Sequence, residues 1–124
     1  MTVIGIGIDL VDIERFRTSL ERTPSMRTRL FTETELAYVE PKADPVPSLA
    51  ARFAAREAVM KSLGLGLGAF GFHEVWVERA DSGAPSLAVT GRARELADDA
   101  GVTSWHISLT HSATTAGAYV LATG

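Results

Sequence analysis

The feature that most constrains the fold is a short segment near the start of the chain in which isoleucine alternates with small or polar residues. Residues 3–9 have the sequence VIGIGID, which places the isoleucines on one face of an extended chain and the glycines with Asp9 on the other. Alternation of this kind predicts a β-strand. Because glycine has no side chain, we expect another backbone or a ligand to approach closely on the glycine face.

The rest of the chain changes between helical and extended patterns. Residues 41–48 contain three prolines and predict a loop, and the segment GLGLGAFG at 64–71 has too many glycines for regular structure. Helices are expected from Asp12 to Pro24, from Thr32 to about Val39, from about Leu49 to Leu63 and from about Gly91 to Ala100. Further strands are expected at 73–79, 86–90, 104–110 and 116–122. We therefore predict an α+β fold, in which helices are mixed with a mainly antiparallel sheet of about five strands.

Length, charge and cysteine content exclude several classes of protein. The 124 residues fit a single domain that covers 1–124. Cysteine is absent, which excludes disulfides, thiolate metal sites and cysteine nucleophiles. The net charge of -3 argues against a nucleic-acid partner, because no excess of positive charge faces the phosphate backbone. No apolar run is long enough to span a membrane and the N-terminus lacks the basic region of a signal peptide, so we expect a cytoplasmic protein without a membrane partner.

Three charged residues are candidates for chemistry. Glu57 and Lys61 lie four residues apart on one face of a predicted helix, either as a surface ion pair worth about 0.3–0.5 kcal/mol or as part of a site. Asp9 either caps the helix that follows, a role that Asp12 fills equally well, or joins Glu57 as an oxygen ligand for a divalent cation. Two carboxylates with open positions for water and phosphate oxygens suit Mg²⁺.

The strand at 104–110 and the glycine-rich segment carry further candidates. His111 follows the strand and is either a hydrogen-bonded residue at the strand end or a catalyst. Ser108 and Thr110 share one strand face, but no nucleophile elbow supports a Ser-His-Asp triad. Gly64, Gly66 and Gly68 could cradle a phosphate, although they match neither the Walker nor the dinucleotide-binding fingerprint.

Four segments, taken in order, resemble the holo-acyl-carrier-protein synthases, a family of small phosphopantetheinyl transferases. They are GIGIDLVDIERF near the start, RFAAREAVMKSLGLGLG in the central helix, the G-x-P turn that ends at Pro85, and HISLTHSATTAGAYV near the end. The family pattern has G-x-D near the N-terminus, a helix with F-A-x-K-E-A-x-x-K and a late S-x-S/T-H. The resemblance covers nearly the whole chain.

The resemblance implies transfer of the 4′-phosphopantetheine arm from coenzyme A to a serine of an apo-acyl-carrier protein, with release of adenosine 3′,5′-bisphosphate. It implies that Asp9 and Glu57 hold Mg²⁺, with Mn²⁺ as an alternative, and that Lys61 contacts the phosphates. The proton of the serine goes either to Glu57 or to a metal-bound water. His111 joins these three residues in the implied catalytic set. The residues implied to surround coenzyme A are Arg52, Arg56, Lys61, Gly64, Gly66, Pro85, Ser108, Thr110 and His111.

The resemblance also implies a homotrimer with active sites between neighbouring subunits. Because carrier proteins are acidic, a basic stripe on this acidic chain is a candidate docking surface. The stripe consists of Arg15, Arg22, Arg27 and Arg29. Charge pattern alone favours an ordinary solvated helix face equally, because glutamates interleave with these arginines.

Two positions depart from the family pattern. Arg56 stands where lysine is usual just before the glutamate, and arginine keeps the charge but not the compact ammonium. Ser112 stands after His111, where the family often has an acidic or other polar residue. We expect retained activity with a changed rate or carrier preference. The alternatives are a coenzyme A- or carrier-binding module that has lost turnover, and a plain structural trimer.

Overall fold

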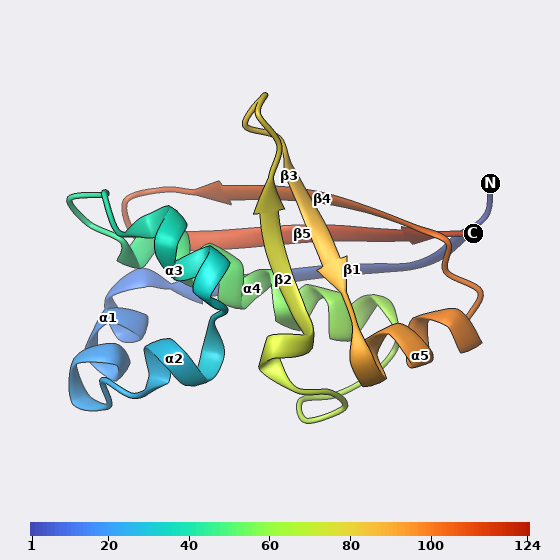
Figure 1. Ribbon diagram of the computed structural model, residues 1–124, viewed down its shortest axis with the longest axis horizontal. Helices are drawn as coiled ribbons and strands as arrows, with labels where there is room; N and C mark the ends of the chain where they lie inside the picture. The colour runs from blue at the N-terminus through green and yellow to red at the C-terminus, as the bar shows by residue number, and fades with distance from the viewer.

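A long three-stranded antiparallel sheet organises the structure, a computed structural model that describes residues 1–124 (Figure 1). In spatial order its strands are β1 (Val3–Asp12), β5 (Thr115–Thr123) and β4 (Ser104–His111). A separate antiparallel hairpin of β2 (Val75–Arg79) and β3 (Pro85–Val89) crosses in front of this sheet in Figure 1. The α+β class and the antiparallel strands are confirmed, although the strands form two sheets rather than one.

The helices lie mainly where hydrophobic spacing predicts them. They are α1 (Ile13–Arg22), α2 (Met26–Leu30), α3 (Glu33–Val39), α4 (Val46–Ser62), the short 3-10 helix η1 (Phe72–Glu74) and α5 (Gly91–Asp99). Thr32 and Glu35 form the predicted capping box of α3. Helix α2 was not predicted from the sequence. The loop predicted before α4 was too long, because Pro47 lies in the first helical turn, where its missing N–H is not needed. None of the helices combines the length and the apolar character required to cross a bilayer.

The glycine face of β1 lies directly against α4. A Cβ atom on Gly5 would be 1.7 Å from the carbonyl oxygen of Ser62, and a Cβ on Gly7 would be 1.8 Å from that of Ala58. No side chain fits at these distances, so the backbones of strand and helix touch, as the VIGIGID segment predicts. This close contact sets the position of α4 relative to the end of the glycine face, where Asp9 stands.

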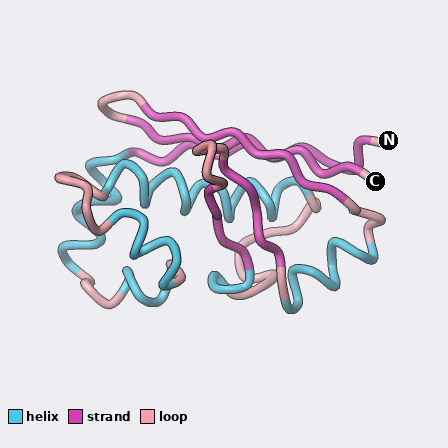
Figure 2. The backbone as a smooth tube through the Cα atoms, turned by 45° about the horizontal axis from the view of Figure 1, so that its top comes forward, coloured by secondary structure: helices cyan, strands magenta, loops and turns pink.

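The other face of the three-stranded sheet carries no helix. Figure 2 shows the helices gathered on one side of this sheet. Tyr119 pairs with Ile8 across the β1–β5 register, so the two side chains share the uncovered face with the other isoleucines of β1. Large hydrophobic side chains are exposed there, namely Ile4 37%, Ile6 54%, Ile8 57%, Leu10 67% and Tyr119 42%. An apolar surface of this kind is typical of an interaction site.

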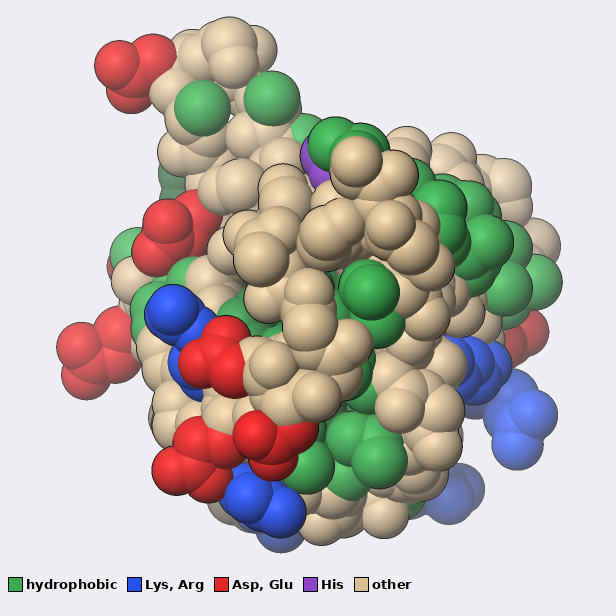
Figure 3. All heavy atoms as spheres, turned by 90° about the vertical axis from the view of Figure 1, so that its right-hand side faces the viewer, with side chains coloured by type: hydrophobic (Ala, Val, Ile, Leu, Met, Phe, Trp, Pro, Cys, Tyr) green, Lys and Arg blue, Asp and Glu red, His purple; other side chains and the backbone are tan.

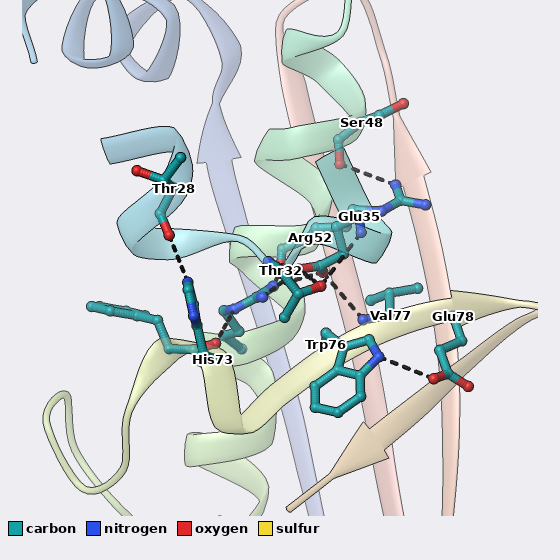
Figure 4. Close-up of polar contacts among 11 residues, drawn as sticks. Thr28, Thr32, Glu35, Ser48, Arg52, His73, Trp76, Val77 and Glu78 are labelled. Carbon is teal, nitrogen blue, oxygen red and sulfur yellow. Dashed lines mark hydrogen bonds and ion pairs between the residues drawn. The ribbon is translucent and has the colours of Figure 1, made fainter. Parts of the chain in front are cut away.

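A fully buried ion pair connects α3, α4 and β2 (Figure 4). Arg56 Nη2 lies 2.5 Å from Glu35 Oε1 and Arg56 Nη1 lies 2.9 Å from Glu35 Oε2, and neither residue is exposed. Arg56 Nε also donates to the Phe72 carbonyl at 2.8 Å, while Glu35 Oε2 accepts from the Val77 N–H at 3.2 Å. The two charges are tolerated in the core because each one has several hydrogen-bonding partners.

Candidate active site

Asp9, Glu57 and Lys61 come together where β1 passes α4. Asp9 stands on the same face of β1 as Gly7, so its carboxylate faces the helix that carries Glu57 and Lys61. Lys61 Nζ donates to Asp9 Oδ1 at 3.0 Å and to the Ile8 carbonyl at 3.0 Å. The Lys61 side chain is 52% exposed and that of Asp9 18%, so the cluster faces solvent.

The surface ion pair between Glu57 and Lys61 is not formed. Lys61 pairs with Asp9 instead, and Glu57 takes part in no ion pair. Burial raises the pKa of Glu57, and the negative charge of Asp9 raises it further, while Lys61 acts in the opposite direction. The alternative role of Asp9 as a cap is wrong, because the side chain of Asp12 caps α1 by accepting from Arg15 N at 2.9 Å.

A surface cavity of about 380 Å³ opens beside the two carboxylates. Its lining includes Asp9 and Glu57, with Arg15, Phe16 and Phe53 next to them. The structure contains no group of three or more His, Cys, Asp or Glu side chains that could hold a metal ion by themselves. Two neighbouring carboxylates in an open cavity fit Mg²⁺, which usually keeps several waters and binds one or two carboxylates together with substrate phosphates.

A second group of cations surrounds the ring of Tyr38. Arg52 Cζ lies 4.5 Å, Lys42 Nζ 5.1 Å and Arg79 Cζ 5.3 Å from the ring centroid. Arg52 is only 1% exposed, and its Nη1 donates to the Ser48 carbonyl at 3.2 Å while its Nε has no partner (Figure 4). Burial, and then the positive charge of Arg79, lower the pKa of Arg52. The negative charge of Glu35 partly compensates Arg52, whereas Lys42 and Arg79 take part in no ion pair and are therefore suited to an anion.

Ser108 and Thr110 lie away from Asp9 within one chain. In the register of the sheet Ser108 pairs with Tyr119, which pairs with Ile8, so Ser108 projects from the uncovered face. Thr110 stands two residues further along the same strand and projects to the same side. Asp9 projects to the opposite face, toward α4, and the sheet separates it from these hydroxyl groups.

The other predicted contacts of coenzyme A are exposed or half-buried but are not joined to the carboxylates by any hydrogen bond. His111 ends β4, and its Nδ1 lies 3.4 Å from the Ser112 carbonyl. Gly64, with a φ of +70°, and Gly66 follow α4 with open space around them. Pro85 is the first residue of β3. Among these positions, Gly64 lies nearest in sequence to Glu57 and Lys61, because only the cap residue Leu63 separates it from α4.

Arg56 contradicts its sequence prediction. Its guanidinium is fully buried, and its hydrogen bonds go to Glu35, to the Phe72 carbonyl and to the Arg52 carbonyl. With no exposed surface it cannot contact coenzyme A in this structure. Its neighbour in sequence, Glu57, faces the cavity, because successive residues of a helix point about 100° apart.

Comparison with known proteins identifies the family. Residues 5–123 match the model of the 4′-phosphopantetheinyl transferase superfamily. The chain belongs to this superfamily. It is 52% identical over 125 residues to a holo-acyl-carrier-protein synthase of Streptomyces avermitilis, with 100% of both chains covered. It is 45% identical over 122 residues to one of Micrococcus luteus, covering 97% of this chain and 91% of that one.

Solved structures of phosphopantetheinyl transferases agree with this assignment. The holo-acyl-carrier-protein synthase of Neisseria meningitidis superposes with a TM-score of 0.89 at 27% identity, covering 99% of this chain and 100% of that one. The Helicobacter pylori synthase, solved in complex with coenzyme A, superposes with a TM-score of 0.81 at 26% identity, covering 95% of this chain and 99% of that one. The predicted family, fold class and enzymatic activity as a phosphopantetheinyl transferase are confirmed.

Arg56 offers a test of the departure from the family lysine. We expect Arg56→Lys to lower the free energy of unfolding by about 1–3 kcal/mol, because an ammonium cannot make the paired contacts to Glu35 and also reach the Phe72 carbonyl. The KM for coenzyme A should stay the same, because the side chain is buried. Urea unfolding measures the free energy of unfolding, and steady-state kinetics measure the KM for coenzyme A. A raised KM with unchanged stability would show that Arg56 contacts coenzyme A after all.

Proposed function

We propose that Asp9, Glu57 and Lys61 form the active site of this transferase, which moves the 4′-phosphopantetheine group from coenzyme A to a serine of an apo-acyl-carrier protein. The observation that carries the proposal is the carboxyl of Glu57, unpaired and with a raised pKa, beside Asp9 in an open cavity. Coenzyme A in the Helicobacter pylori structure supports the choice of donor. The cytoplasmic location stays a prediction of the sequence.

The two carboxylates are the residues that would hold Mg²⁺, and Mn²⁺ suits the same oxygen ligands. When bound, the ion would neutralise the negative charge of the diphosphate as the phosphoanhydride bond breaks. Lys61 would contact the same phosphates through its ammonium. The carboxylate of Glu57 would accept the proton of the attacking serine, directly or through a water.

The direct test is the mass of a purified apo-carrier protein after incubation with this protein, coenzyme A and Mg²⁺. We expect a gain of one phosphopantetheine group that disappears when a chelator removes the divalent cation. Carriers of fatty-acid and polyketide synthesis should be compared, because the sequence does not identify the carrier. If no carrier gains mass while coenzyme A still binds, the protein is an inactive binding module.

The cations around Tyr38 are our candidate for the nucleotide end of coenzyme A. Lys42 and Arg79 support this proposal because both are exposed beside the Tyr38 ring and take part in no ion pair, and the buried Arg52, whose Nε has no partner, adds positive charge next to them. The lysine and the second arginine were not found from the sequence, because no spacing rule connects residues of three separate elements. Gly64, Gly66 and Pro85 stay proposed contacts of coenzyme A on the family resemblance.

The uncovered face of the three-stranded sheet is our candidate for the subunit interface of a homotrimer. Ile6, Ile8 and Leu10 support this proposal because more than half of each side chain is exposed on one flat surface. The same face carries Ser108 and Thr110, so an interface there would bring these hydroxyls close to a neighbouring subunit. This arrangement, with His111 at the edge of the sheet, agrees with active sites shared between subunits.

The variant Ile6→Glu tests the interface. If a second copy of the chain covers this face of the three-stranded sheet, the new carboxylate is buried in an apolar contact. We expect the variant to have about one third of the molar mass of the parent in light scattering, since an unpaired charge in an apolar interface costs several kcal/mol. Leu67→Glu is the matched control, because Leu67 is 69% exposed but lies outside the sheet. Equal masses for parent and Ile6→Glu would exclude this face as the interface.

The arginines of α1 and α2 are our candidate surface for the acidic carrier protein. Arg15, Arg22, Arg27 and Arg29 are exposed and take part in no ion pair. Arg15 also lines the cavity that contains Asp9, so a docked carrier would bring its serine toward the carboxylates. Neither of the interleaved glutamates, Glu14 and Glu21, forms an ion pair with these four arginines, and Glu14 pairs with Arg17 instead.

Charge reversal by Arg22→Glu tests the docking surface. We expect the KM for the carrier to rise about tenfold at low salt, with an unchanged KM for coenzyme A, because a rim charge mainly affects encounter with a charged partner. Arg92→Glu is the control, because Arg92 lies on α5 and pairs with Glu95. Figure 3 shows the end of the molecule toward which α5 runs, where basic and acidic side chains lie next to one another. A similar change in both variants would show that only net charge matters.

A further inference from the structure

The proposed metal ligand Asp9 forms an ion pair with a cation of the chain itself. Lys61 Nζ lies 3.0 Å from Asp9 Oδ1 and is also held by the Ile8 carbonyl at 3.0 Å. Glu57, the second carboxylate, has no such partner. The site is therefore asymmetric, with one carboxylate neutralised by the protein and one that is not.

A divalent cation and the Lys61 ammonium compete for the same carboxylate. The ammonium occupies Oδ1 of Asp9, and a cation on the remaining oxygen would face a positive charge only a few ångströms away. The pair is not buried deeply enough to be fixed, because the Lys61 side chain is 52% exposed. Lys61 also stands in the last turn of α4, shortly before the glycine-rich segment.

We infer that Lys61 is a displaceable counter-ion of Asp9, which makes the binding of a divalent cation and the binding of coenzyme A depend on each other. This inference rests on the proposed function. The diphosphate of coenzyme A offers the ammonium a second anionic partner within reach of the cluster, and Lys61 leaves Asp9 to contact it. The released carboxylate then accepts the divalent cation. Because linkage is reciprocal, the cation strengthens coenzyme A binding by the same factor.

The inference distinguishes two roles that a phosphate-binding lysine could have. A lysine that only contacts phosphate leaves the affinity for the free cation unchanged when it is removed. A lysine that is the counter-ion of Asp9 weakens the affinity for the divalent cation. Its replacement by a neutral residue therefore makes the cation bind more tightly in the absence of coenzyme A. The affinity of the protein without coenzyme A is therefore the decisive quantity, because phosphate oxygens themselves attract the cation once coenzyme A is bound.

The test measures Mn²⁺ binding by electron paramagnetic resonance in the parent, Lys61→Gln, Lys61→Met and Lys61→Arg, without and with coenzyme A. Without coenzyme A, we expect the two neutral variants to bind Mn²⁺ about fivefold more tightly than the parent, and Lys61→Arg to resemble the parent because it keeps the charge. Asp9→Asn, alone and combined with Lys61→Gln, should abolish binding. Circular dichroism melts check that every variant is folded.

Two results would overturn the inference in different ways. If the neutral variants bind Mn²⁺ no more tightly than the parent while Asp9→Asn still abolishes binding, Lys61 is not a counter-ion, and the proposed metal site stands. If Asp9→Asn leaves Mn²⁺ binding unchanged both in the parent and in Lys61→Gln, with and without coenzyme A, Asp9 is not a metal ligand. The proposed metal site is then wrong, and so is the inference that rests on it.

Discussion

Replacement of Glu57 by glutamine is expected to lower the rate of phosphopantetheine transfer by about 10³-fold. The amide keeps the size of the side chain but loses the negative charge, so it is a poorer ligand for a divalent cation and cannot accept the proton of the substrate serine. The variant should be folded, because Glu57 takes part in no ion pair and is only half-buried. We expect Glu57→Gln to be slightly more stable than the parent, because burial and the negative charge of Asp9 disfavour the charged carboxylate of Glu57, which the variant lacks.

The measurement is the initial rate at which apo-carrier protein gains mass under saturating coenzyme A and Mg²⁺. Glu95→Gln on α5 is the matched control, because it removes the same charge from an exposed surface pair with Arg92. A Glu57→Gln rate within threefold of the control would remove Glu57 from the active site. Thermal melts of both variants separate a loss of chemistry from a loss of fold.

A large loss of stability is expected for Gly7→Ala. The added methyl group would lie 1.8 Å from the Ala58 carbonyl oxygen, which belongs to the backbone and cannot rotate away. The strand must then separate from α4, and we expect a loss of more than about 3 kcal/mol in the free energy of unfolding, or no folded protein at all. Transfer activity should fall in parallel, because the same separation moves Asp9 away from Glu57.

Gly66→Ala is the matched control for this prediction. No atom lies within 4 Å of a Cβ at Gly66, so the same added methyl group meets open space. We expect its urea midpoint to stay near that of the parent, since a surface substitution without a clash usually changes stability by less than about 0.5 kcal/mol. Similar midpoints for Gly7→Ala and Gly66→Ala would show that α4 does not rest on the glycine face of β1.

Local signals in the sequence predicted those parts of the structure that depend on neighbouring residues. The alternation at VIGIGID identified both the strand and the close approach to its glycine face, and the spacing of Thr32 and Glu35 identified a capping box. The same glutamate shows the limit of this reasoning. Its carboxylate also binds Arg56, 21 residues away, and no periodic pattern connects the two positions.

The candidate site was predicted from a resemblance rather than from physical pattern. Glu57 and Lys61 alone are compatible with an ordinary surface pair, and the structure shows that Lys61 joins Asp9 instead. Arg56 was placed beside coenzyme A because it stands where the family usually has a lysine. A helix turns adjacent residues in different directions, however, and Arg56 lies in the core while Glu57 does not. The exposed isoleucine face was also beyond sequence reasoning, because alternation defines two faces without saying which one is covered.

The Glu35–Arg56 pair has a consequence for how this fold can change over generations. Loss of either partner alone leaves an uncompensated charge in the core, which costs about 3–5 kcal/mol, whereas a well-packed neutral pair at both positions is often tolerated. Substitutions that remove the charge of Glu35 or of Arg56 are therefore expected to be tolerated only when both residues change together. In a library that randomises both positions, survivors should carry matched pairs, either both charged or both apolar, and single mismatches should be depleted after selection for folded protein.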